Sequence, residues 1–202
     1  MIRKKIENFW YYHKIKVFVV IFAIITISIA GSNSSGGEAD LEIGYVIGDE
    51  EVLLQDTDKN IALLESLIQG KDKENASVSV LPLTPSRLEL EFTIGISHIL
   101  ILDKETLLPF VDYHFFEPLD KYVDKYNMDI SECPEVKADP NATDDYKVYA
   151  LPVKQIDFLL EMGFPENYYF TIRLPKQDDS DDIVRNKNAH IILDYMLEYS
   201  PK

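Results

Sequence analysis

The segment from His98 to Leu102 reads HILIL and ends directly in Asp103. After the histidine it is apolar without interruption, where a half-buried strand would alternate apolar and polar residues. A continuous apolar run of this length is typical of a strand that is covered on both faces of its sheet. Helices must supply that cover, so the segment predicts an α/β fold with the sheet as its middle layer.

Further segments alternate along the chain between strand-like and helix-like patterns. Strands are expected at 41–47, 76–83, 147–153 and 168–174, and helices at 59–69 (capped by Asp58 and ended by Gly70), 105–111, 119–126 and 183–199. This order is typical of strands that are joined by helical crossovers. It predicts a three-layer sandwich with a mostly parallel sheet.

The stretch from Thr84 to Ile96 carries two competing patterns. Threonine followed by Pro85 is typical of a helix N-cap and first helical position. From Leu88 onward, however, apolar residues alternate with period two, as in a strand. Two neighbouring parallel strands need a crossover of about ten residues or more. This favours a helix to about Phe92 and leaves the strand as the alternative.

Residues 17–30 (VFVVIFAIITISIA) contain no charged residue and predict a transmembrane segment. Fourteen residues form a helix of roughly 21 Å, shorter than the ~30 Å hydrocarbon core. Lys14 and Lys16 can extend it by snorkelling, and the aromatic run Phe9–Tyr12 suits the interface. Residues 1–16 hold five basic residues and one acidic one. The positive-inside rule therefore places them in the cytoplasm and the rest of the chain outside the cell membrane.

A cleaved signal peptide is the alternative for the same segment. Ser28-Ile29-Ala30 before Gly31 fits the small-x-small pattern of a cleavage site. The long aromatic flank favours a retained single-pass anchor. Residues 31–40, rich in Gly and Ser, are expected to form a flexible linker. The extracytoplasmic domain is then expected at 41–202.

The chain after residue 16 is strongly acidic. Of the 20 basic and 35 acidic residues in the whole sequence, 15 and 34 lie there. Such a charge repels the phosphates of polynucleotides, which excludes nucleic acid as a partner. Cys133 is the only cysteine, so no internal disulfide forms, and no cysteine follows the apolar segment to carry a lipid.

No motif predicts catalysis, a cofactor or a metal ion. Asp56, Asp58 and Asn60 begin like a calcium loop, but Ile61 and Leu67 occupy the places of its glycine and its closing glutamate. A helix start is therefore the better interpretation of this stretch.

The remaining reactive residue types are also poorly placed for chemistry. His98, His114 and His190 lack the spacing of a zinc-ligand pair. The acidic run Asp178–Asp182 is expected to be a solvated loop, and the carboxylates near Cys133 disfavour a thiolate. We expect no enzymatic activity and no bound cofactor. The sequence does not identify the residues of any binding site.

Five stretches taken in order resemble a known family. They are LEIGYVI at 41–47, ASVSVLPL at 76–83, GISHILILDKE at 95–105, FFEPLDKYV at 115–123 and KVYALPV at 147–153. Together they resemble one lobe of the extracellular solute-binding proteins of bacterial ABC importers, with the type-2 periplasmic-binding-protein-like fold. The resemblance extends to small, membrane-anchored members from Gram-positive bacteria.

The resemblance implies a binding or accessory module that has a transporter or another envelope protein as its partner. Those receptors hold a ligand between two lobes, whereas only about fifty residues follow KVYALPV here. No ligand-binding residue is therefore transferred. The alternative is a structural or interaction protein of the envelope without a small ligand. A pocket at the carboxyl ends of the strands, near Gly48-Asp49 and Asp103-Lys104, would favour the binding module.

Overall fold

The computed structural model describes residues 39–47, 52–70, 76–95, 97–111, 115–131, 133, 136–138 and 147–201. The chain divides into two units, Met1–Glu38 and Ala39–Lys202, and all of the described residues belong to the second. The predicted segments 1–16 and 17–30 and most of the linker lie outside them. No helix within the described ranges is long and apolar enough to cross a bilayer.

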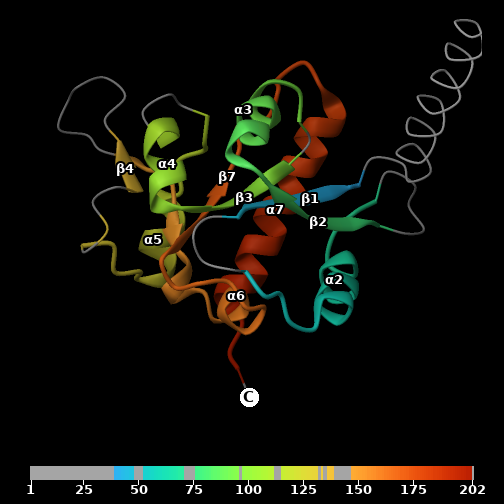
Figure 1. The fold of residues 1–202 in the computed structure, drawn as a ribbon. Helices are drawn as coiled ribbons and strands as arrows, with labels where there is room; N and C mark the ends of the chain where they lie inside the picture. Colours follow the sequence, from blue (N-terminus) through green and yellow to red (C-terminus); the bar gives the residue numbers. More distant parts are fainter. Residues whose placement is uncertain are drawn as a thin grey trace, which may run out of the picture. The chain divides into compact units, whose positions relative to one another are not determined.

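The domain is built on a five-stranded sheet (Figure 1). In spatial order its strands are β2 (Val78–Leu83), β1 (Leu41–Val46), β3 (Ser97–Asp103), β7 (Tyr168–Ile172) and β6 (Leu151–Pro152). Strands β2, β1 and β3 are parallel, whereas β7 runs antiparallel to both β3 and β6. The sheet is therefore mixed. The prediction of a mostly parallel sheet was correct for the first three strands and missed the direction of β7.

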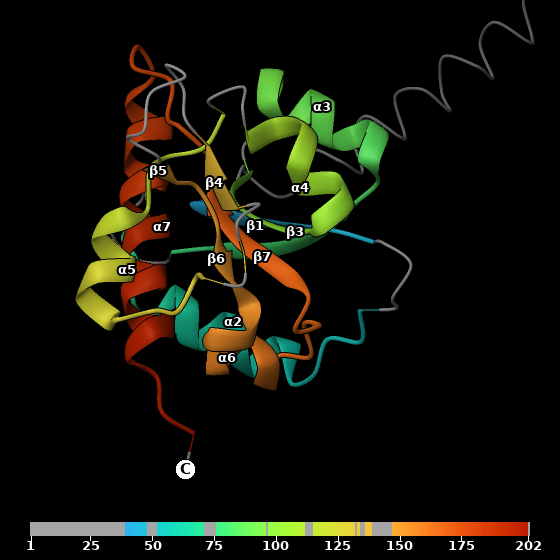
Figure 2. The same cartoon turned by 90° about the vertical axis from the view of Figure 1, so that its left-hand side faces the viewer.

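Helices cover both faces of this sheet, as the two views show (Figures 1 and 2). Helices α3 (Pro85–Ile94) and α4 (Lys104–Val111) lie on one face, and α2 (Thr57–Glu65), α6 (Asp157–Glu161) and α7 (Ser180–Glu198) lie on the other. Helix α5 (Asp120–Tyr126) lies beside α7. The residues from Ser97 to Leu102 are all buried, as the HILIL segment predicts for a strand with cover on both sides.

Helix α3 settles the ambiguity at Thr84–Ile96 in favour of a helix. Its N-cap is Thr84, whose hydroxyl accepts a hydrogen bond from the N–H of Arg87 at 3.3 Å, and Pro85 is the first helical residue. Leu88 is fully buried, whereas Leu90 is 56% exposed. The period-two pattern therefore does not mark a buried face, and helical spacing decides which leucine reaches the core.

Several predicted boundaries were wrong for local reasons. Helix α2 starts at Thr57 with Asp56 as a left-handed N-cap residue, so Asp58 lies inside its first turn. It ends at Glu65 rather than at Gln69, because the Ser66 hydroxyl donates to the carbonyl of Leu63 at 2.6 Å and competes with the helical ladder.

The last helix and the linker also differ from the prediction. The Asp179 carboxylate caps α7 by accepting from the N–H groups of Asp181 and Asp182. Asp178 and Asp179 thus precede the helix and are exposed, as expected of a solvated loop, whereas Asp181 and Asp182 lie in its first turn and Asp182 is buried. On α7, Ile192 is buried, whereas Ile191 is 40% exposed. Asp40, expected in the linker, is buried and accepts a hydrogen bond from the N–H of Ser77 at 2.9 Å.

The predicted strand 147–153 is broken into two short pieces. Lys147–Val148 (β5) pairs with Lys137–Ala138 (β4) in a small separate sheet, and only β6 joins the main sheet. Pro152 ends β6 because proline has no N–H to continue the ladder. The short helix Val153–Gln155 (η2) and α6 then lead into β7.

Candidate functional site

A buried ionic cluster lies between the sheet and α7. The Asp182 carboxylate accepts from the Arg173 guanidinium at 2.9 Å, and the His98 ring lies 3.2 Å from the same oxygen. All three side chains are at least 97% buried. The guanidinium also donates to the backbone carbonyl of Ser97 at 3.0 Å. The cluster therefore links α7 to the start of β3.

The position of His98 follows from an irregularity in the sheet. Ser97 pairs with Glu42, and the next pair is Ile99 with Ile43, so the register passes over His98. Burial alone would raise the pKa of Asp182. The Lys176 N–H, which donates to its carboxylate at 2.6 Å, and the nearby charges of His98 and Arg173 more than offset this and lower that pKa.

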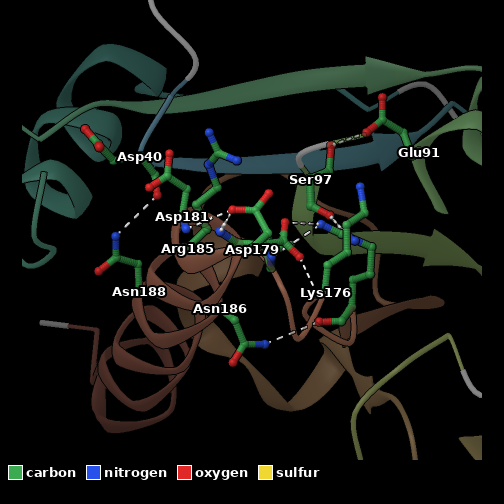
Figure 3. Close-up of polar contacts among 12 residues, drawn as sticks. Asp40, Glu91, Ser97, Lys176, Asp179, Asp181, Arg185, Asn186 and Asn188 are labelled. Carbon is green, nitrogen blue, oxygen red and sulfur yellow. Dashed lines mark hydrogen bonds and ion pairs between the residues drawn. The ribbon is translucent and has the colours of Figure 1, made fainter. Parts of the chain in front are cut away.

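The polar contacts continue along α7 (Figure 3). The Asn188 amide donates to the backbone carbonyl of Asp40 at 3.2 Å. Asn186 donates to the Glu117 carboxylate at 3.1 Å, and the second oxygen of Glu117 lies 2.7 Å from Nε2 of His190. Nδ1 of His190 lies 2.8 Å from the Tyr122 hydroxyl. This second group joins α5 to α7.

These buried groups stabilise the fold. Every buried side-chain nitrogen and oxygen in the described part of the chain has a hydrogen-bond partner. None of the three cavities described below is lined by His98, Arg173 or Asp182. A perturbed carboxylate in a cleft would be a candidate for catalysis. This carboxylate is instead closed in by Arg173, His98 and the Lys176 N–H, which connect α7 to the sheet.

Glu117 makes the stability of the domain depend on pH. Burial would raise its pKa above the ordinary 4.5, but the hydrogen bond and charge of His190, and the amide of Asn186, lower it overall. A carboxylate with a lowered folded-state pKa contributes stability above its unfolded pKa and loses it as the pH falls through the folded value. We expect the midpoint of urea unfolding to fall between pH 6 and pH 3, and to fall less steeply in Glu117→Gln. Equal slopes would contradict this role.

A groove lies between α3 and α4, and we call it the α3–α4 groove. Its volume is about 410 Å³, and it is lined by Pro85, Ser86, Glu89, Glu105, Thr106, Pro109 and Phe110. Helix α3 begins two residues after β2 ends, and α4 begins directly after β3. The groove is therefore formed by helical turns that follow the carboxyl ends of two parallel strands.

One wall of the groove is aromatic. The ring of Phe110 lies 4.7 Å from that of Phe92, which in turn stacks on Phe115 at 4.5 Å. Phe116, fully buried, contacts Phe92 edge-on at 5.4 Å. This cluster restricts the position of Phe110, because aromatic rings that pack against several neighbours have little freedom to move. The half-buried Phe110 thus offers a preformed apolar surface.

A second cavity, which we call the outer pocket, lies on the other side of α3. Its volume is about 580 Å³, and it is lined by Glu42, Thr84, Ser86, Arg87, Leu90, Glu91 and Gly95. The carboxylates here already have partners: Ser97 donates to Glu42 at 2.5 Å, and Arg87 lies 3.5 Å from Glu91. Ser97 also lies 3.1 Å from Glu91 (Figure 3). The outer pocket is larger, but both of its carboxylates already have partners within the chain: an arginine for Glu91 and a serine hydroxyl for Glu42.

A third cavity of about 300 Å³ lies beside β6. It is lined by Cys133, Pro152, Lys154, Glu166, Asn167 and Tyr169. Cys133 is a free, buried thiol. That it is chemically inert stays a prediction.

The structure places the singled-out residues apart from one another. His98 and His190 belong to two different buried groups, and His114 lies outside the described residues. Within the described ranges, no group of three or more His, Cys, Asp or Glu side chains could hold a metal ion. Gly48-Asp49 lies outside the described residues. Asp103-Lys104 directly precedes Glu105, which lines the α3–α4 groove.

Sequence reasoning missed the residues that line the groove. Serine, glutamate and proline on exposed helical turns are individually ordinary. The available signal was positional. Thr84-Pro85 and Asp103 mark two helix starts that follow β2 and β3, which lie on either side of β1 and are parallel to it. Residues just beyond such starts lie at one edge of a sheet.

Comparisons with known proteins leave the family open. No family model matches the chain, and no curated protein matches it. Two solved structures of the N-glycan transport solute binding protein (NgtS) from Streptococcus pneumoniae match in part. One has 17% identity and a TM-score of 0.33; the other, in complex with Man1GlcNAc, has 16% and 0.32. Each match covers 55% of this chain and 24% of NgtS. TM-scores this low establish no shared fold, so the family resemblance stays a proposal.

Proposed function

We propose that this chain is a membrane-anchored, extracytoplasmic binding module that holds a small molecule in the α3–α4 groove. The observation that carries the proposal is the position of the groove at the carboxyl ends of β2 and β3. Ligands of open α/β sheets bind at this edge, because loops and helix starts converge there on a rigid sheet.

The chemistry of the groove supports ligand binding. Phe110, Pro85 and Pro109 supply apolar surface, and the hydroxyls of Ser86 and Thr106 supply hydrogen-bonding groups around it. A small-molecule site combines these two features, since apolar contact supplies affinity and a few polar groups fix orientation. The N–H of Thr106 already donates to the Asp103 carboxylate at 2.8 Å, which holds the start of α4 in place before any ligand binds.

The cellular setting in the proposal comes from the sequence. The apolar segment 17–30 and the basic flank before it support a single-pass anchor that leaves the domain outside the membrane. A groove on a tethered domain can present its ligand to a neighbouring membrane protein. A transporter or another envelope protein is accordingly the partner that we propose.

A thermal-shift screen with two tryptophan variants tests the proposal. Full-length protein in mild detergent is screened against sugars, amino acids, amines and short peptides for compounds that raise the melting temperature. We expect Ser86→Trp to abolish the shift, because the indole fills the groove. Leu90→Trp, four residues further along α3, lines only the outer pocket and should preserve the shift. Loss in both variants, or in Leu90→Trp alone, would place the ligand elsewhere.

A further inference from the structure

Two carboxylates face the α3–α4 groove from different helices. Glu89 comes from α3 and Glu105 from α4. Among the residues that the structure describes, neither side chain has a hydrogen-bond or ion-pair partner. Other carboxylates of the domain are paired: Asp194 with Lys125 at 2.7 Å, and Glu91 with Arg87 at 3.5 Å. The groove thus gathers negative charge that the described part of the chain does not neutralise.

The residues around the groove favour a positively charged ligand over a negatively charged one. Among the described residues that line the groove, none is a lysine, an arginine or a histidine. Residues 39–202 contain 15 basic and 33 acidic residues, because five basic and two acidic residues precede them. The field of such a domain repels anions and concentrates cations at a cleft lined with carboxylates. An anionic ligand would find no positively charged partner among these lining residues.

The aromatic wall specifies which kind of cation fits. A bare metal ion needs several oxygen ligands at close range. No set of three or more His, Cys, Asp or Glu side chains in the described ranges meets that need. An organic cation is different, because its carbon atoms pack on Phe110 and its charge interacts with the ring face and with Glu89 and Glu105.

From this arrangement, and resting on the proposed function, we infer that the ligand of the α3–α4 groove is a small organic amine. Its ammonium or guanidinium group donates charge-assisted hydrogen bonds to Glu89 and Glu105, with Ser86 and Thr106 as further acceptors. Its carbon skeleton lies against Phe110.

The test compares charge classes on the full-length protein in mild detergent. Putrescine, L-arginine and choline are the cationic probes, glucose and maltose the neutral ones, succinate the anionic one, and calcium chloride the metal. Affinities are measured by calorimetric titration at low and at physiological salt. At least one amine should bind, more weakly at higher salt, because a charge interaction in an open groove is screened.

Paired variants then identify the carboxylates. The double variant Glu89→Gln, Glu105→Gln should weaken amine binding by about tenfold or more, because both partners for charge-assisted hydrogen bonds are lost. Asp124→Asn removes an exposed charge on α5, outside all three cavities, and should leave the affinity unchanged within about twofold. Equal amine affinity in the wild type and the double glutamine variant would overturn the inference.

The outcomes separate this inference from the proposed function. Binding of glucose or maltose but of no amine, abolished by Ser86→Trp, would overturn the amine class and keep the groove as the binding site. Binding of calcium alone would also overturn it. No binding of any probe in the titrations, together with no stabilising compound in the broader screen, would count against both.

Discussion

Asp182→Asn is expected to lower the free energy of unfolding by about 3–5 kcal/mol. The substitution keeps the shape of the side chain and removes its charge. Arg173 and His98 then remain buried beside a neutral amide, and Arg173 cannot lose its proton. Removing one partner of a buried ion pair is costly, because the remaining charge stays out of water without compensation. Urea unfolding of the full-length protein in mild detergent measures the change.

Two further variants make this result specific. Asp178→Asn makes the same chemical change at an exposed position of the same acidic run, and should shift stability by less than about 0.5 kcal/mol. The double variant Arg173→Met, Asp182→Leu removes both charges together. It should lose less stability than Asp182→Asn alone, since no uncompensated charge is left. A loss at Asp182 no larger than that at Asp178 would show that the ionic cluster does not hold α7 to the sheet.

Gly163→Ala is the second substitution with a large expected effect, of about 2–3 kcal/mol. Gly163 has φ of 95°, a backbone conformation that residues with a side chain rarely adopt. A Cβ atom there would lie 2.2 Å from the backbone carbonyl oxygen of Leu53. That loop cannot move away easily, because the N–H of Gln55 donates to the carbonyl of Met162 at 2.9 Å.

Chemical unfolding of Gly163→Ala is compared with that of Glu166→Ala, which lies in the same connection between α6 and β7. Glu166 is exposed, and its replacement should change the free energy of unfolding by less than about 0.5 kcal/mol. If Gly163→Ala were as stable as Glu166→Ala, the contact between this turn and the loop before α2 would not form in solution.

The features that could be read from the sequence depend on neighbouring residues. The HILIL run identifies β3 because a strand that is covered on both faces of its sheet needs apolar side chains at consecutive positions. Thr84-Pro85 identifies the start of α3 because a cap acts within three residues. In both cases the physical cause and the sequence pattern occupy the same few positions.

The features that were missed depend on residues far apart in the chain. Asp182 looks like part of a solvated run, and its burial follows from Arg173 and from His98, which belongs to β3. The direction of β7 is set by the path through η2 and α6, since an apolar strand has the same pattern in either direction. The α3–α4 groove forms where the first turns of two helices lie side by side on one face of the sheet. These helices come from separate segments of the chain, so no single segment predicts the groove.

The central claim is that the α3–α4 groove binds a small ligand. Calorimetric titration of the full-length protein, of Ser86→Trp and of Leu90→Trp with one stabilising compound tests it most directly. We predict one binding site in the wild-type protein and in Leu90→Trp, and no measurable heat of binding in Ser86→Trp. Unchanged binding by Ser86→Trp would contradict the claim, because a tryptophan in the groove leaves no room for a ligand there.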